Sequence, residues 1–90
     1  MKWEKLGYVL ASRYRQDIML ILTEGEKTPK EIADKTGLYL SHVSSTLSEL
    51  ERQGLVICLT PKLRRGRLFG LTKSGKRIAK ELQKRYKKEE

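Results

Sequence analysis

The chain of 90 residues has little of the chemistry that catalysis or metal binding needs, with one cysteine, Cys58, and one histidine, His42. A lone cysteine cannot form an internal disulfide, and neither residue has the neighbours that a thiolate or imidazole metal site requires. One histidine also cannot be both a catalytic base and the group that orients it. The sequence contains no glycine-rich phosphate-binding motif and no HExxH zinc motif. We therefore expect no enzyme activity, no cofactor and no bound metal.

Long hydrophobic runs are absent too. No stretch approaches the ~18 apolar residues of a membrane span, and the N-terminus has no secretory signal with an apolar centre and a cleavage site. These absences predict a cytoplasmic protein without a membrane partner. Hydrophobic residues make up 38% of the chain and charged residues 34%, which at this length predicts one globular domain over residues 1–90.

Positive charge is unevenly distributed along the chain. Residues 1–60 contain eight Lys and Arg against eight Asp and Glu, whereas residues 61–90 contain twelve against three. The whole net charge of +9 therefore lies in the last third. Segregated positive charge predicts a surface that faces a polyanion. The alternative is a basic, solvated tail.

Hydrophobic spacing and capping residues predict helices in the first part of the chain. Residues 1–11 are expected to form a short helix or arm. Ser12 is a plausible N-cap for a second helix, and Gly25 is its natural C-terminal stop. The apolar stripe of this second helix would consist of Tyr14, Ile18, Ile21 and Leu22.

Residues 28–54 have the pattern of two helices joined by a tight turn. Thr28 can cap the first helix, because Glu31 stands where a capping box needs a carboxylate. Gly37 suits the turn, since glycine readily adopts positive φ. Ser41 is expected to cap the second helix. The apolar residues that can meet where the helices cross are Ile32, Ala33, Leu38, Val43, Leu47 and Leu50.

The following segment predicts a β-hairpin over residues 55–72. Residues 55–60 are apolar and β-branched, and residues 68–71 form the returning strand. Thr72 can then cap a final helix over residues 73–88. Its apolar face would contain Ile78, Ala79, Leu82 and Tyr86. The expected fold class is mainly α with a small β-hairpin.

Three segments together resemble the winged helix-turn-helix of MarR- and ArsR-type transcriptional regulators, above all the small archaeal members. They are TPKEIADKTGLYLSHVSSTLSELERQGLV, the RGRLF segment of the hairpin and the LTKSG start of the last helix. The resemblance covers roughly residues 10–82. It implies a three-helix core, a wing and a C-terminal helix. It also implies sequence-dependent binding of double-stranded DNA, with the second motif helix in the major groove and the basic wing near the minor groove.

The resemblance also indicates which residues would contact DNA. From residues 28–54 they are Thr28, Ser41, His42, Ser44, Ser45, Ser48 and Arg52. From the wing they are Lys62, Arg64, Arg65 and Arg67. Each group has an alternative: Ser41 could serve only as a cap, the other serines could form a solvated helix face, and the arginines could keep an edge strand soluble.

In MarR- and ArsR-type proteins the terminal helices form a two-fold dimer. A homodimer is therefore expected, because two half-sites offset the weak binding of one small module. Its interface would involve Trp3, Leu6, Ile78, Leu82 and Tyr86. The alternative is that these apolar stripes complete the core of one monomer. The last helix, with eight Lys and Arg, would lie near the DNA backbone.

The sequence also allows a function other than DNA binding. Family members commonly carry Arg or Lys directly after the serine of SHVS-type motifs, and here that residue is Ser45. The helix from Ser41 to Gln53 has one arginine against two glutamates, for a net charge of −1. These features favour an interaction module that docks on another protein or on RNA.

Overall fold

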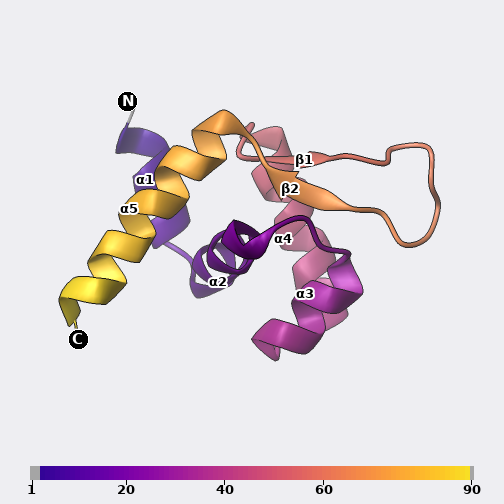
Figure 1. Ribbon diagram of the computed structural model, residues 1–90, viewed down its shortest axis with the longest axis horizontal. Coiled ribbons are helices and arrows are strands. Elements are labelled where there is room, and N and C mark those ends of the chain that lie inside the picture. Colours follow the sequence, from indigo (N-terminus) through magenta and orange to yellow (C-terminus); the bar gives the residue numbers. More distant parts are fainter. Residues whose placement is uncertain (1–2, 90) are drawn as a thin grey trace.

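The computed structural model describes residues 3–89, with side-chain burial described for residues 4–86. The elements in chain order are α1 (Trp3–Leu10), α2 (Arg13–Ile21), the 3-10 turn η1 (Leu22–Glu24), α3 (Pro29–Thr36), α4 (Leu40–Arg52), β1 (Val56–Cys58), β2 (Phe69–Leu71) and α5 (Lys73–Glu89). Figure 1 shows α1 and α5 at one end of the longest axis and the loop between β1 and β2 at the other. The mainly helical fold with one hairpin is as predicted.

Local capping signals set most helix ends where the sequence predicted them. The Ser12 side chain accepts a hydrogen bond from the Arg15 backbone N–H at 3.4 Å and caps α2. Thr28 and Glu31 form the predicted capping box at the start of α3. Gly37 follows α3 with a φ of 76°, in the left-handed region. The start of the helix-turn-helix is therefore encoded locally.

The start of α4 differs from the prediction. Its N-cap is Tyr39, not Ser41, and no side chain caps it. Tyr39 has an extended backbone, and its carbonyl accepts the first helical hydrogen bond, from Val43 N–H at 3.0 Å. Ser41 thus lies inside the first turn, so the expected capping role for its hydroxyl is wrong.

The hairpin is shorter than predicted but has an additional partner. Antiparallel pairing joins Val56 to Leu71 and Cys58 to Phe69. On its other edge, Phe69 exchanges two backbone hydrogen bonds with Lys27, at 3.0 and 2.9 Å. This bridge ties the hairpin to the segment just before α3, and so fixes the wing relative to the helix-turn-helix.

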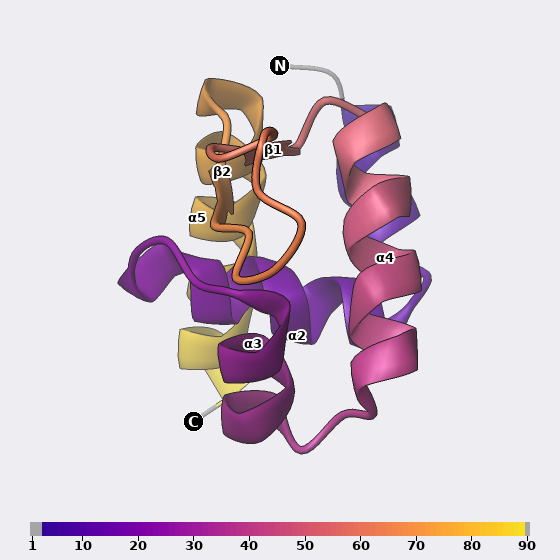
Figure 2. The same ribbon diagram turned by 90° about the vertical axis from the view of Figure 1, so that its right-hand side faces the viewer.

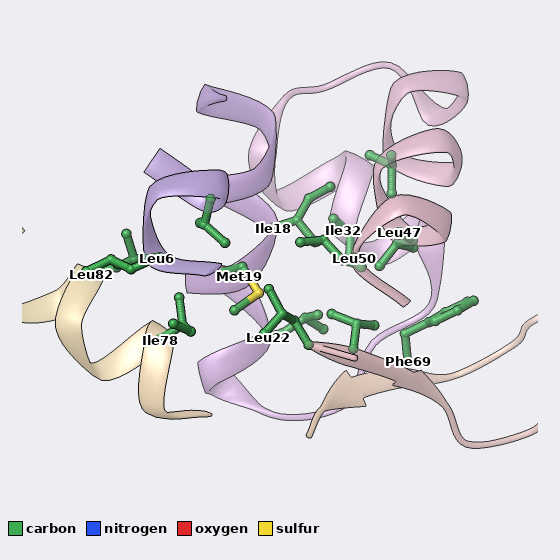
Figure 3. Packing of buried hydrophobic residues seen from close by; sticks show 14 residues of the cluster. Leu6, Ile18, Met19, Leu22, Ile32, Leu47, Leu50, Phe69, Ile78 and Leu82 are labelled. Atoms are coloured by element: carbon green, nitrogen blue, oxygen red, sulfur yellow. The ribbon is translucent and has the colours of Figure 1, made fainter. Parts of the chain in front are cut away.

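One core joins all the helices to the base of the hairpin (Figure 3). The predicted crossing of α3 and α4 is confirmed, since Ile32, Val43 and Leu50 are fully buried. The expected stripe of α2 is partly wrong. Tyr14 is 39% exposed, whereas Met19, outside the stripe, is completely buried.

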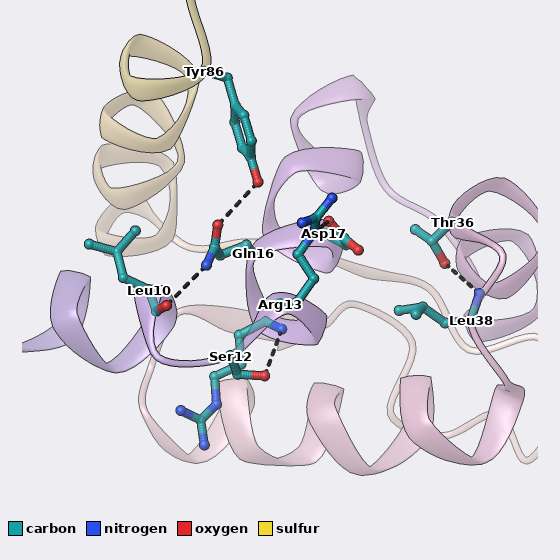
Figure 4. A network of polar contacts seen from close by, with 9 residues as sticks. Leu10, Ser12, Arg13, Gln16, Asp17, Thr36, Leu38 and Tyr86 are labelled. Atoms are coloured by element: carbon teal, nitrogen blue, oxygen red, sulfur yellow. Dashed lines mark hydrogen bonds and ion pairs between the residues drawn. The ribbon is translucent and has the colours of Figure 1, made fainter. Parts of the chain in front are cut away.

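Three of the five residues expected at a dimer interface are buried within the monomer. Leu6, Ile78 and Leu82 are buried within the single chain, so their side chains complete the monomer core and are not free to meet a partner. The side chain of Trp3 lies outside the described residues. Tyr86 is half-buried, and its hydroxyl donates to Gln16 Oε1 at 3.1 Å (Figure 4). The alternative of a completed monomer core therefore describes these stripes better.

Within the described range, none of the helices combines the length and the hydrophobicity needed to cross a bilayer.

Candidate nucleic-acid interface

Helix α4 presents a serine-rich face to solvent. At about 100° per residue, Ser41, Ser45 and Ser48 fall opposite the buried positions of the helix. The buried side is formed by Val43, Thr46, Leu47 and Leu50. All of the predicted contact residues of this helix are exposed, namely Ser41, His42, Ser44, Ser45, Ser48 and Arg52. The core therefore orients α4 with its small hydroxyl side chains outward.

Three aromatic rings gather at the N-terminal end of α4. The ring of His42 stacks on that of Tyr14, with centroids 4.9 Å apart and an angle of 24° between the planes. Tyr39 meets His42 edge to face, with centroids 5.7 Å apart. Tyr39 is 77% exposed and the adjacent Leu40 is 51% exposed. The sequence predicted Tyr14 in the apolar stripe of the second helix and no role for Tyr39 and Leu40, because helical periodicity does not show which apolar residues stay exposed.

The wing loop, residues 59–68, carries the predicted basic residues. Every residue from 61 to 67 is exposed. Its shape is held by internal hydrogen bonds: Leu68 N–H donates to Thr60 Oγ1 at 2.9 Å, and Arg67 Nε donates to the Leu63 carbonyl at 2.6 Å. Gly66 turns the chain with a φ of 66°. Among the side chains of residues 4–86, no carboxylate forms an ion pair with Arg64, Arg65 or Arg67, so these charges stay open to an external anion.

The wing loop and the helix-turn-helix share one side of the molecule. Figure 2 shows α3, α4 and the wing loop together on the face toward the viewer, with α5 behind. The last helix, expected near the DNA backbone, thus lies on another side of the molecule than the wing loop, and its contact with DNA stays a prediction. The basic residues of the last third form two groups at opposite ends of the longest axis, one in the wing loop and one on α5 (Figure 1).

The backbone and the side chain of Thr28 cap helix α3. Its hydroxyl accepts the Glu31 backbone N–H at 3.2 Å, and its own N–H donates to Glu31 Oε1 at 2.8 Å. The hydrogen bonds from the Thr28 backbone and side chain lower the pKa of Glu31, and Lys27 and Lys35 lower it further. The carboxylate thus stays ionised, and the capping box positions α3.

One of the two glutamates on α4, Glu49, lies beside a cation on α2. Glu49 lies 3.5 Å from Arg15 Nε on α2, an ion pair whose atoms are not aligned as a hydrogen bond. The same guanidinium lies 3.7 Å from the centre of the Tyr8 ring and donates from Nη1 to the Tyr8 carbonyl at 2.7 Å. Arg15 therefore joins α1, α2 and α4 and partly neutralises α4.

A cleft of about 620 Å³ lies between η1, the hairpin base and α5. Its lining combines apolar side chains such as Leu22 and Leu59 with Lys76 and Lys80. In the part of the chain that the structure describes, no group of three or more His, Cys, Asp or Glu side chains is arranged to hold a metal ion.

Comparison with known proteins agrees with this geometry. Residues 14–57 match the family model described as bacterial regulatory protein, arsR family. No curated protein matches the sequence at a significant level.

Solved structures share the fold over most of the chain. ZitR from Lactococcus lactis in complex with DNA is 26% identical with a TM-score of 0.75, and the match covers 83% of this chain and 52% of ZitR. A homodimeric winged helix-turn-helix DNA-binding domain from Mycobacterium bovis, described as a possible ArsR-family transcriptional regulator, is 26% identical with a TM-score of 0.72, covering 89% of this chain and 73% of that one.

The adhesin competence repressor AdcR of Streptococcus pyogenes, at 17% identity and a TM-score of 0.78, shares the fold, with 94% of this chain and 70% of AdcR covered. This chain spans about half the length of most of the ZitR chains that it matches, 53% in one of them and 69% in another. Together these findings confirm the predicted resemblance to the winged helix-turn-helix of ArsR-type regulators.

Proposed function

We propose that this chain is a cytoplasmic transcriptional regulator that binds double-stranded DNA in a sequence-dependent way. Helix α4 lies in the major groove, and the wing loop reaches the adjacent minor groove. Ser41, His42, Ser44, Ser45, Ser48 and Arg52 contact the duplex from α4. Lys62, Arg64, Arg65 and Arg67 contact it from the wing. Binding uses no metal or cofactor.

The observation that carries this proposal is that α4 and the wing loop share one side of the molecule. Both lie on one side of the molecule (Figure 2). The serine face allows a close approach to the duplex, because its side chains are short. The wing arginines supply positive charge without carboxylate partners among the described residues. Guanidinium groups suit phosphates and narrow minor grooves.

We also propose that the chain acts as a homodimer. A single module this small makes few contacts, and two half-sites about 34 Å apart would combine their affinities. The matched domain from Mycobacterium bovis is described as homodimeric. Because Leu6, Ile78 and Leu82 are buried within the monomer, we propose that other, exposed residues form the interface. Sedimentation at several protein concentrations tests this proposal, and a monomer at all of them would refute it.

Salt dependence tests the DNA-binding proposal directly. If about 6–10 phosphates are contacted, duplex affinity falls ~10³–10⁵-fold between 50 and 200 mM salt. Fluorescence anisotropy with a labelled duplex measures this change. Affinity that stays constant over this range would contradict the proposal.

A pair of double variants separates a wing contact from a simple effect of net charge. Arg65→Ala with Arg67→Ala removes two wing charges, and we expect most of the duplex affinity to be lost. The matched control, Arg77→Ala with Arg85→Ala, removes two exposed charges from α5 at the other end of the molecule. The control should lose far less affinity. Equal losses would mean that net charge, not wing position, governs binding.

A second candidate function is an interaction module that docks on another protein or on RNA. The lack of a basic residue on the exposed face of α4 other than Arg52 favours it, although Arg15 offsets the charge of Glu49. Under this alternative, the wing double variant would keep its partner. The two candidates are therefore separated by the same substitutions.

A further inference from the structure

Helix α4 lacks the side chains that usually read bases in the major groove. Arginine and lysine recognise guanine there, and asparagine and glutamine recognise adenine. Residues 40–52 contain none of these except Arg52, which lies in the last turn. The residues that reach base edges come mainly from the N-terminal part of a recognition helix. Helix α4 therefore has almost no side chain that can recognise a base through two hydrogen bonds.

The N-terminal end of α4 instead presents apolar surface. Tyr39 is 77% exposed and Leu40 is 51% exposed, next to the exposed stack of His42 on Tyr14. Single exposed apolar residues need no explanation, but a contiguous exposed group marks a contact surface. This group lies at the end of α4 that would enter the groove first. The major groove offers one apolar group, the C5-methyl of thymine.

We propose that Tyr39 and Leu40 recognise thymine methyl groups in the major groove, so that the preferred duplexes are rich in A·T pairs beneath the start of α4. This inference rests on the proposed DNA-binding function and adds the class of sequence that is bound. The hydroxyls of the serine face then contact phosphates or bases without discriminating strongly.

The wing loop favours the same kind of sequence by another route. Runs of A·T pairs narrow the minor groove and deepen its negative potential, which attracts arginine. Arg65 and Arg67 flank Gly66 at the exposed tip of the wing loop. A duplex with A·T pairs in both regions would therefore satisfy α4 and the wing together.

Uracil substitution isolates the methyl group. Duplexes are first selected from a random library with the full 90-residue chain. Each thymine in a selected duplex is then replaced by uracil, which removes the methyl and leaves base pairing intact. Burial of one methyl-sized group corresponds to about a threefold to fivefold change in affinity. We expect a loss of that size at one or two thymines in each half-site.

A variant identifies the residue responsible. Leu40→Ala should prefer the thymine duplex less than the wild type does, because its part of the apolar contact with the methyl group is gone. Leu63→Ala is the matched control: Leu63 is 48% exposed but lies in the wing loop, and its loss should leave the thymine preference unchanged. Because Leu40 is half-exposed, both variants should fold, as helical circular dichroism will show.

The outcomes distinguish this inference from the proposed function. If no duplex is selected, DNA binding itself fails and the inference fails with it. If duplexes are bound but uracil costs no affinity, or the selected sequences are rich in G·C pairs, only the thymine reading is overturned. A preference for thymine that survives undiminished in Leu40→Ala and in a Tyr39→Ala variant would overturn the assignment to these residues.

Discussion

The imidazole of His42 stacks on the phenol ring of Tyr14, with centroids 4.9 Å apart. This contact joins α2 to the first turn of α4. Tyr39 approaches the same imidazole edge to face, so His42 is held by rings on two sides. Fixing its rotamer before binding reduces the entropy that a DNA contact would cost. Tyr14 thus acts on the interface through His42.

Removing the Tyr14 ring should therefore weaken duplex binding. We expect Tyr14→Ala to lower affinity by roughly threefold to tenfold, since an aromatic pair contributes about 0.5–1.5 kcal/mol. The free energy of unfolding should fall by about 1 kcal/mol or less, because the ring is 39% exposed. Anisotropy titrations and urea melts measure the two effects. Tyr14→Phe, which keeps the stack, serves as the control, and unchanged affinity in Tyr14→Ala would refute a role for the stack.

The capping box at α3 predicts a stability change that is independent of DNA. Thr28→Ala removes the hydroxyl that accepts the Glu31 N–H. We expect a loss of about 1 kcal/mol in the free energy of unfolding, within the usual range for an N-cap. Urea denaturation measures it. Thr28→Ser, which keeps the hydroxyl, should lose much less, and equal losses in both variants would contradict the capping role.

The same box predicts a dependence on pH. Because the folded state lowers the pKa of Glu31, its contribution is fully present above the unfolded pKa of about 4.3 and is lost as pH falls through the folded pKa. Glu31→Gln can still accept a hydrogen bond but cannot titrate. Its unfolding free energy should therefore fall less steeply than that of the wild type in acid. Parallel curves for the two proteins between about pH 6 and 3 would refute this linkage.

Replacing glycine by alanine should have opposite effects on stability at two positions, Gly75 and Gly7. A Cβ on Gly75 would lie 2.0 Å from the Leu55 carbonyl oxygen, whereas a Cβ on Gly7 would meet nothing within 4 Å. Gly75→Ala must push α5 away from the hairpin base, and we expect a loss of at least about 2 kcal/mol. Gly7→Ala, at an exposed position of α1, should stabilise the fold by about 0.5–1 kcal/mol. Thermal melts of both variants provide the check, and effects of the same sign would contradict this packing.

The sequence predicted the features whose signals are local. Thr28, Glu31 and Gly37 mark the ends of α3 within ten residues, and the apolar spacing of α4 predicted which side is buried. The bridge between Lys27 and Phe69 could not be foreseen, because it joins distant segments through backbone atoms alone. Strand propensity gives no information about such a partner.

The polar residues of the candidate site could be predicted from the sequence, because polar side chains usually lie on the surface. The serines and wing arginines are exposed as expected. Apolar residues are ambiguous, however, since a hydrophobic stripe looks the same whether it completes a core or meets a partner. Ile78 was expected at an interface and is buried, while Tyr14 was expected in the core and is exposed. Only packing in three dimensions separates these cases.

Substitution of Tyr86 tests whether its side chain stabilises the fold of the monomer or the association of two subunits. Its hydroxyl donates to Gln16 Oε1, and Gln16 Nε2 in turn donates to the Leu10 carbonyl at 3.0 Å (Figure 4). The chain of hydrogen bonds links α5, α2 and the end of α1 within one molecule. Tyr86→Phe should lower the free energy of unfolding by about 0.5–1.5 kcal/mol, the usual loss for one hydrogen bond. The association constant of the dimer should not change.

A double-variant cycle isolates the bond. Gln16→Ala removes both hydrogen bonds, the one from Tyr86 and the one to Leu10, so it should destabilise the fold more than Tyr86→Phe does. Adding Tyr86→Phe to Gln16→Ala should then have almost no further effect, because the acceptor is already absent. Sedimentation equilibrium measured on the same samples reports dimerisation separately from folding. Weaker association with unchanged unfolding would instead place Tyr86 at the interface between subunits, as the sequence alone had suggested.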